Sequence, residues 1–166
     1  DSPIFYEEFL ANSLVPLIES HDFTLDIHSN HTGRNTFGFL DYPNDLAKKW
    51  TMSLGLESIV TGWPELFLPE EDFSTLACAH KAKNISITVE CGYHDDPSAI
   101  DVAYECINRT LQFLDMVDSS ASGPNKTQTS YMRVEHRIIK EKEGVFTKDW
   151  AHLMPIQQGQ LIAKYG

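Results

Sequence analysis

Two stretches of the chain place reactive side chains where strands are expected to end. Residues 23–27 alternate between apolar and polar side chains as a strand does, and His28 follows them directly. Residues 84–89 are β-branched along most of their length, and Glu90 closes this second strand. Open α/β sheets bind ligands at the carboxyl ends of their strands, so we expect both side chains to face one cleft.

Metal-assisted hydrolysis is the chemistry open to these two side chains. A neutral imidazole is a good zinc ligand, and the nearby carboxylate of Asp26 can fix the tautomer of His28. A glutamate at the mouth of a site can act as a general base. Each residue alone also has a plainer interpretation, with His28 bonded to backbone and Glu90 solvated at a strand end.

Weaker candidates lie close to the two stretches. Arg34, in the loop after His28, could hold a substrate carboxylate through two parallel hydrogen bonds, or it could be a solvated loop arginine. His94, shortly after Glu90, could line the same pocket. Three aromatic side chains are interpreted as core or rim packing rather than as substrate stackers: Trp50, Trp63 and Tyr93.

Helices and strands alternate along most of the chain. Apolar spacing predicts helices over residues 4–20, 44–54, 71–82 and about 97–114, and strands over residues 23–27, 58–60 and 84–89. Asn44 is the expected cap of the second helix, and Asp72 or Ser74 that of the third. Residues 29–43 are predicted to be a loop. This alternation predicts an α/β fold, with a mostly parallel sheet flanked by helices.

The composition changes after about residue 120. We expect residues 1–120 to form the α/β domain, residues 121–130 a linker rich in Ser, Gly and Asn, and residues 131–166 the start of a small β domain. Short strands are predicted in this last part over residues 134–139, 144–146 and 159–163. So short a segment is not expected to close a barrel by itself.

Composition excludes some classes of function. A net charge of −11 with no basic stripe argues against nucleic acid as a partner, and no apolar run is long enough to predict a membrane-spanning helix. The apolar fraction of 42% is enough to build a core. Three cysteines without a C-x-x-C pair fit a reduced, cytoplasmic protein. The expected partner is a small-molecule substrate, and a homo-oligomer is left open.

Together the two stretches resemble the succinylglutamate desuccinylase/aspartoacylase family, a branch of the zinc carboxypeptidase fold. The resemblance rests on D-x-H-S ending at Ser29, on T-V-E-C-G over residues 88–92, and on D-D-P-S-A over residues 95–99 ahead of a long helix. It covers residues 4–117. In the tail, residues 144–146 and 155–162 resemble the start of the family's C-terminal β domain.

The resemblance implies an activity and a mechanism. His28 matches the family's third zinc ligand, and Glu90 matches the acid that deprotonates the attacking water and later protonates the leaving amine. The implied protein is a zinc-dependent amidohydrolase that holds one zinc ion per site. It would cleave the amide of an N-acyl amino acid or a related small substrate.

The chain departs from the family's pattern at the metal. The other two zinc ligands come from an earlier H-x-x-E, and this sequence contains none. The family's Asn/Arg substrate-binding motif is absent too. We therefore expect a chain truncated at its front, and at its end as well, that alone neither binds zinc tightly nor hydrolyses amides. A zinc carboxypeptidase acting on peptides and a non-catalytic binding module remain alternatives.

Overall fold

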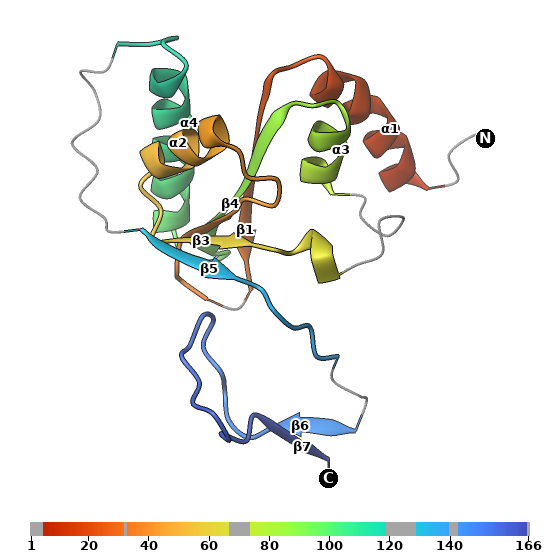
Figure 1. Ribbon diagram of the computed structural model, residues 1–166, viewed down its shortest axis with the longest axis vertical. Helices are drawn as coiled ribbons and strands as arrows, with labels where there is room; N and C mark the ends of the chain where they lie inside the picture. The colour runs from red at the N-terminus through yellow and green to blue at the C-terminus, as the bar shows by residue number, and fades with distance from the viewer. Residues whose placement is uncertain (1–4, 32, 67–73, 119–128, 140–142, 166) are drawn as a thin grey trace.

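A five-stranded sheet organises the protein (Figure 1). The computed structural model describes residues 5–31, 33–66, 74–118, 129–139 and 143–165. The strands of the sheet are β1 (Phe23–Asn30), β2 (Phe37–Phe39), β3 (Ser58–Thr61), β4 (Ile85–Tyr93) and β5 (Ser130–Arg133). The helices are α1 (Tyr6–Glu19), α2 (Asp45–Ser53), α3 (Thr75–Lys81) and α4 (Ser98–Phe113), with a 3-10 turn, η1, over Pro64–Leu66.

The strand order is β1-β4-β2-β3-β5. Three of the four neighbouring pairs are parallel, and only β2 and β4 run antiparallel. The predicted α/β class with a mostly parallel sheet is therefore confirmed. The antiparallel pair divides the sheet into two parallel blocks that point in opposite directions, with β1 and β4 in one block and the other three strands in the second.

Helices cover both faces of the sheet, with α2 and α4 on one side and α1 and α3 on the other (Figure 1). Alternate residues of β4 face the first pair, and Ile87 and Val89 are fully buried there. The indole of Trp50 on α2 donates a hydrogen bond of 3.1 Å to the hydroxyl of Thr110 on α4 within this core. The side chains at the intervening positions of β4, among them that of Glu90, therefore point to the opposite face of the sheet.

Side-chain caps fix where two helices begin. The side chain of Asn44 accepts a hydrogen bond from the backbone N–H of Ala47, so the predicted cap of α2 is confirmed. Ser74 makes the equivalent bond to Ala77, which settles the start of α3 in favour of Ser74. Asp72, the alternative, lies outside the described residues. Of the helices that the structure describes, none combines the length and apolarity needed to cross a membrane.

The tail differs from its prediction in two strands. Residues 134–139 form no strand, and the chain instead pairs earlier, where β5 runs parallel to β3. The strand predicted over residues 159–163 is found at Ala163–Tyr165 (β7), antiparallel to β6 at Gly144–Phe146, which was predicted correctly. Because β5 completes the main sheet, the α/β unit extends beyond the predicted linker. The division of the chain into separate domains stays a prediction.

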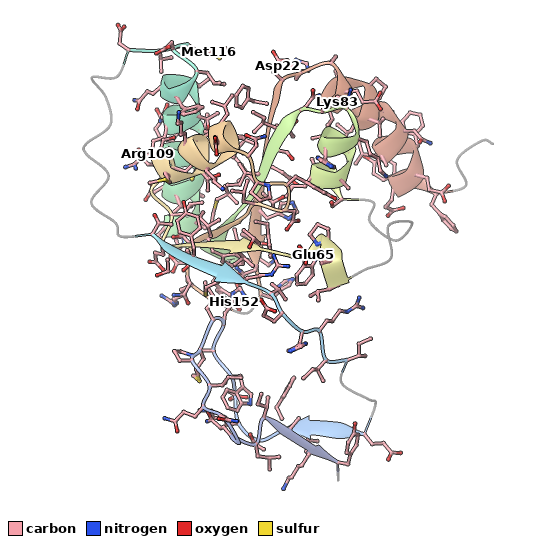
Figure 2. All side chains as sticks on the ribbon, in the orientation of Figure 1. Asp22, Glu65, Lys83, Arg109, Met116 and His152 are labelled. Atoms are coloured by element: carbon pink, nitrogen blue, oxygen red, sulfur yellow. The ribbon has the colours of Figure 1, made fainter. Side chains whose placement is uncertain are left out.

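The tail also contacts the sheet through His152, which Figure 2 shows beside the strands. The His152 ring packs against Phe37 at the start of β2, with ring centroids 4.8 Å apart. A Cβ atom on Gly33 would lie 2.5 Å from the Cβ of His152, so only glycine leaves room for this approach. The segment around residue 152 therefore packs close to the end of the sheet where His28 and Glu90 lie.

Candidate active site

His28 and Glu90 lie directly opposite each other on adjacent parallel strands. They are Cα partners in the β1/β4 ladder, near the carboxyl end of both strands. Both line one cavity of about 350 Å³ on the α3 side of the sheet, which we call the His28–Glu90 cavity. The predicted placement of these two side chains in a shared cleft is thus present in the structure.

A chain of hydrogen bonds holds the His28 ring. Its Nε2 lies 3.0 Å from Oδ1 of Asp26, two residues earlier on the same face of β1. The hydroxyl of Thr88, the cross-strand partner of Asp26, donates to Oδ2 of the same carboxylate at 3.4 Å. The His28 side chain is about half exposed, at 51%. With Nε2 engaged, Nδ1 is the nitrogen left to bind a ligand.

Glu90 has a polar neighbour on β1. The side-chain amide of Asn30 donates to Oε2 of Glu90 at 3.5 Å, and its own oxygen accepts from the backbone N–H of Gly33 at 2.8 Å. Asn30 is therefore fixed at one end by the loop and faces the carboxylate at the other. The half-buried Glu90 side chain is positioned at the cavity wall while keeping contact with solvent.

His94 lies on the opposite face of the sheet from Glu90. It lines a second cavity, of about 420 Å³, beside α4, together with Ser29 and part of His28. Nδ1 of His94 is 2.5 Å from the hydroxyl of Ser29. The ring of His31 packs edge to face against the ring of His94, with ring centroids 4.0 Å apart. The structure therefore does not bring His94 into the His28–Glu90 cavity.

Arg34 faces the start of α4. Its guanidinium lies 3.2 Å from Oδ2 of Asp96, and its side chain is 82% exposed. Two hydrogen bonds from Ser98, and to a smaller extent the charge of Arg34, lower the pKa of Asp96. Arg34 lines neither of the two cavities. The structure therefore does not place Arg34 where it could bind a substrate carboxylate in either cavity.

The sequence interpretation missed one side of the cavity. Phe39, the last residue of β2, and Asp41, two residues beyond it, line the cavity together with Trp63, which was predicted to serve packing. The rings of Phe39 and Trp63 are 5.6 Å apart at 54°. The alternation of Phe37, Phe39 and Asp41 is typical of a strand. The strand has only three residues and lies in a polar segment, so the segment was predicted to be a loop.

Among the described residues, His28 is the one whose surroundings suit a zinc ligand. His28 fits that role, since a carboxylate orients its ring and its second nitrogen is open. Within the part of the chain that the structure describes, no group of three His, Cys, Asp or Glu side chains could hold a metal ion. A catalytic zinc takes about three protein ligands, so these residues alone do not complete the site.

Comparisons with known proteins place this arrangement in a known fold. No family model and no curated protein matches the chain. Among solved structures, it is similar to a succinylglutamate desuccinylase/aspartoacylase from Rhodobacter sphaeroides, with a TM-score of 0.76, 14% identity, and coverage of 100% of this chain and 53% of that one. It is also similar to a succinylglutamate desuccinylase from Vibrio parahaemolyticus, with a TM-score of 0.71, 14% identity, and coverage of 100% of this chain and 53% of that one.

The Ectoine utilization protein EutE (DoeB) from Ruegeria pomeroyi, in its product-bound structure, gives a TM-score of 0.66 at 14% identity, over 99% of this chain and 52% of that chain. The chain thus spans about half the length of the solved structures that it matches. At this level of identity the likeness concerns the fold. The chain has the fold of one half of the succinylglutamate desuccinylase/aspartoacylase structures.

Proposed function

We propose that this chain is the part of a zinc-dependent hydrolase that carries one zinc ligand, His28, and the general base, Glu90. The observation that carries the proposal is their cross-strand pairing, which puts an oriented imidazole and a carboxylate in one cavity. The substrate is the amide of an N-acyl amino acid or a related small molecule. Similar structures named for succinylglutamate desuccinylase support this choice.

Each residue of the cavity has a defined task in this hydrolysis. Zinc, when bound, supplies Lewis acidity and brings the pKa of water towards about 7. Glu90 takes the proton of the attacking water and later returns it to the leaving amine, which is worth roughly 10²–10⁴ in rate. Asp26 keeps His28 in one tautomer. Asn30 holds the Glu90 carboxylate at the cavity wall.

The remaining metal ligands must come from other residues of the complete protein. The chain contains no H-x-x-E, the pattern that supplies them in the family that it resembles. We therefore propose that residues 1–166 alone neither bind zinc tightly nor cleave amides. A reduced, cytoplasmic setting belongs to the same proposal and is supported by the three free cysteines.

Two alternatives use the same fold differently. A peptide carboxypeptidase would need the same pair of residues but a carboxylate clamp for the peptide end, and Arg34 is turned towards Asp96 instead. A non-catalytic binding module would need neither His28 nor Glu90. The orientation of His28 by Asp26 favours a metal-using enzyme over such a module.

Zinc binding by the complete protein tests the proposal. His28→Ala should weaken zinc affinity, measured by competition with a coloured chelator, by at least about 10-fold because a ligand is lost. His136→Ala, in the exposed tail, is the matched control and should leave affinity unchanged. Amine release from N-acyl amino acids should require zinc. Equal zinc affinity in wild type and His28→Ala, without amide cleavage, would point to the binding module.

A further inference from the structure

A turn in the tail brings His152 to the sheet (Figure 2). The backbone N–H of Met154 donates to the carbonyl of Ala151 at 3.2 Å, so His152 and Leu153 occupy the corner of a four-residue turn. Leu153 has a φ of +56°, a conformation that residues other than glycine seldom adopt. Such a conformation persists only where the surrounding structure holds it. The contacts that His152 makes with the sheet are therefore those of a fixed turn.

His152 touches the connection between β1 and β2 at two points. Its Cβ atom lies so close to Gly33 that a Cβ atom added there would be 2.5 Å away. Its ring packs edge to face on the buried ring of Phe37, with centroids 4.8 Å apart at 78°. Nδ1 of His152 is buried and has no hydrogen-bond partner among the described residues. Both contacts are therefore van der Waals contacts of the side chain.

Each of these two points leads directly to Glu90. The backbone N–H of Gly33 donates to the side-chain oxygen of Asn30 at 2.8 Å, and the side-chain amide of Asn30 donates to Oε2 of Glu90 at 3.5 Å. Phe37 is the antiparallel partner of Glu90 in the β2/β4 ladder. One contact of His152 thus reaches the Glu90 carboxylate through the Asn30 side chain, and the other reaches the Glu90 backbone through strand pairing.

We propose that His152 is a positioning residue for Glu90. The inference rests on the proposed function, in which Glu90 is the general base. The described linings of the His28–Glu90 cavity and of the cavity beside α4 do not include His152, so it acts through Gly33 and Phe37 and not on the substrate. A base must lie within hydrogen-bond reach of the proton that it takes, and a displacement of about 1 Å can cost roughly 100-fold in rate. The packing of the tail on the sheet therefore sets how well Glu90 works.

The contact with Gly33 is tested in the complete, zinc-loaded protein, by amine release from the N-acetyl amino acid that the wild type cleaves fastest. Gly33→Ala should lower kcat by roughly 10- to 100-fold, because the new Cβ atom displaces the backbone that is bonded to Asn30. In a His152→Gly background the obstructing Cβ atom is gone, so adding Gly33→Ala should lower kcat by less than about threefold. Equal losses in the two backgrounds would overturn the proposal.

The ring of His152 is tested by two further variants and a matched control. His152→Ala loses the packing on Phe37, so kcat should fall by roughly 3- to 30-fold. His152→Phe keeps a ring of similar size and should stay within about threefold of wild type, because the ring acts by packing. His136→Ala, in the exposed part of the tail, should leave kcat unchanged. A His152→Phe variant as slow as His152→Ala would overturn the proposal, because the imidazole would then act chemically.

A Glu90→Gln background distinguishes positioning of the base from a general loss of structure. There His152→Ala should lower the remaining rate by less than about threefold, since the group that it positions is absent. With Glu90 present, His152→Ala should leave KM and zinc affinity within about threefold of wild type, so that the loss appears in kcat. The same loss of kcat in both backgrounds would make His152 a contact for stability alone and overturn the proposal.

Hydrogen exchange separates failure of this inference from failure of the proposed function. It is measured by mass spectrometry on the complete protein without substrate, over residues 33–39 and 85–93. His152→Ala should raise exchange at least about threefold in both segments, and His136→Ala should not. Absence of amide cleavage would contradict the proposed function, and raised exchange would still support the positioning of Glu90 by His152. Unchanged exchange together with a slow Glu90→Gln variant would overturn the positioning and leave the hydrolase proposal standing.

Discussion

Replacing Glu90 by Gln isolates the proton-transfer step from every other task of the site. The substitution keeps the shape of the side chain, and the new amide oxygen can still accept the hydrogen bond from Asn30. The neighbours in sequence, Val89 and Cys91, are buried on the other face of the sheet and are not disturbed. We therefore expect the free energy of unfolding to change by less than about 0.5 kcal/mol.

The loss of the proton carrier should appear almost entirely in kcat. General acid–base catalysis contributes roughly 10²–10⁴ in rate, which corresponds to about 2.7–5.5 kcal/mol of activation free energy. Zinc affinity should change only a few-fold, because the hydrogen bond between Asp26 and His28 lies on β1 and is not touched. The expected signature is a protein that binds metal and substrate but turns over slowly.

The assay follows amine release under single-turnover conditions in the complete protein, with zinc affinity measured on the same samples. Glu57→Gln is the matched control, since the Glu57 carboxylate accepts a hydrogen bond from the exposed Asn35 and lies outside both cavities. It should keep wild-type kcat. A Glu90→Gln variant with kcat within fivefold of wild type would refute the role given to Glu90. A large loss of zinc affinity in this variant would indicate that Glu90 is a zinc ligand instead.

Two predictions concern the core. Thr110→Val should lower the free energy of unfolding by about 1–3 kcal/mol in urea denaturation, because it leaves the buried indole N–H of Trp50 unpaired; Thr110→Ser keeps the hydroxyl and should cost less. Burial raises the pKa of Cys91 to about 11 and of Cys106 to about 12, so a thiol reagent at pH 8 should label Cys78 first. Because the fold favours the protonated thiols, the free energy of unfolding should fall as pH rises from about 9 through 11, and fast labelling of all three thiols in the native protein would contradict this.

The long periodic elements could be predicted from the sequence, and the shortest strand could not. The apolar, β-branched run that ends at Glu90 is strand in any context that buries one face, and the structure confirms it. Strand β2 has three residues, one of them Gly38, within a polar segment predicted as loop. A Cβ atom on Gly38 would lie 2.9 Å from Cδ1 of Ile87, so a larger residue there would force that side chain to shift. Tertiary pairing with two neighbours makes this strand, and local propensity does not.

The position of His94 shows a second limit of sequence reasoning. Counting by twos from Glu90 would put both side chains on the same face of the strand. The β1/β4 register shifts between His28 and Asn30, and Gly92 adopts a φ of +112°. This irregularity reverses the alternation, so His94 meets Ser29 on the α4 side. A one-residue shift leaves no trace in the polarity pattern.

The segment over residues 33–36 lies across the end of β4, where the carbonyl of Arg34 would be 3.3 Å from a Cβ atom on Gly92. β4 is made later in the chain than both strands that flank it, and its contact from Glu90 to Asn30 spans 60 residues. Its pairing with both neighbours therefore brings together residues far apart in sequence and closes a long loop. His28 and Glu90 lie in one cavity only in molecules in which β4 is paired with its neighbouring strands. A ligand that needs both side chains will bind those molecules alone, and so will protect the strand against local opening.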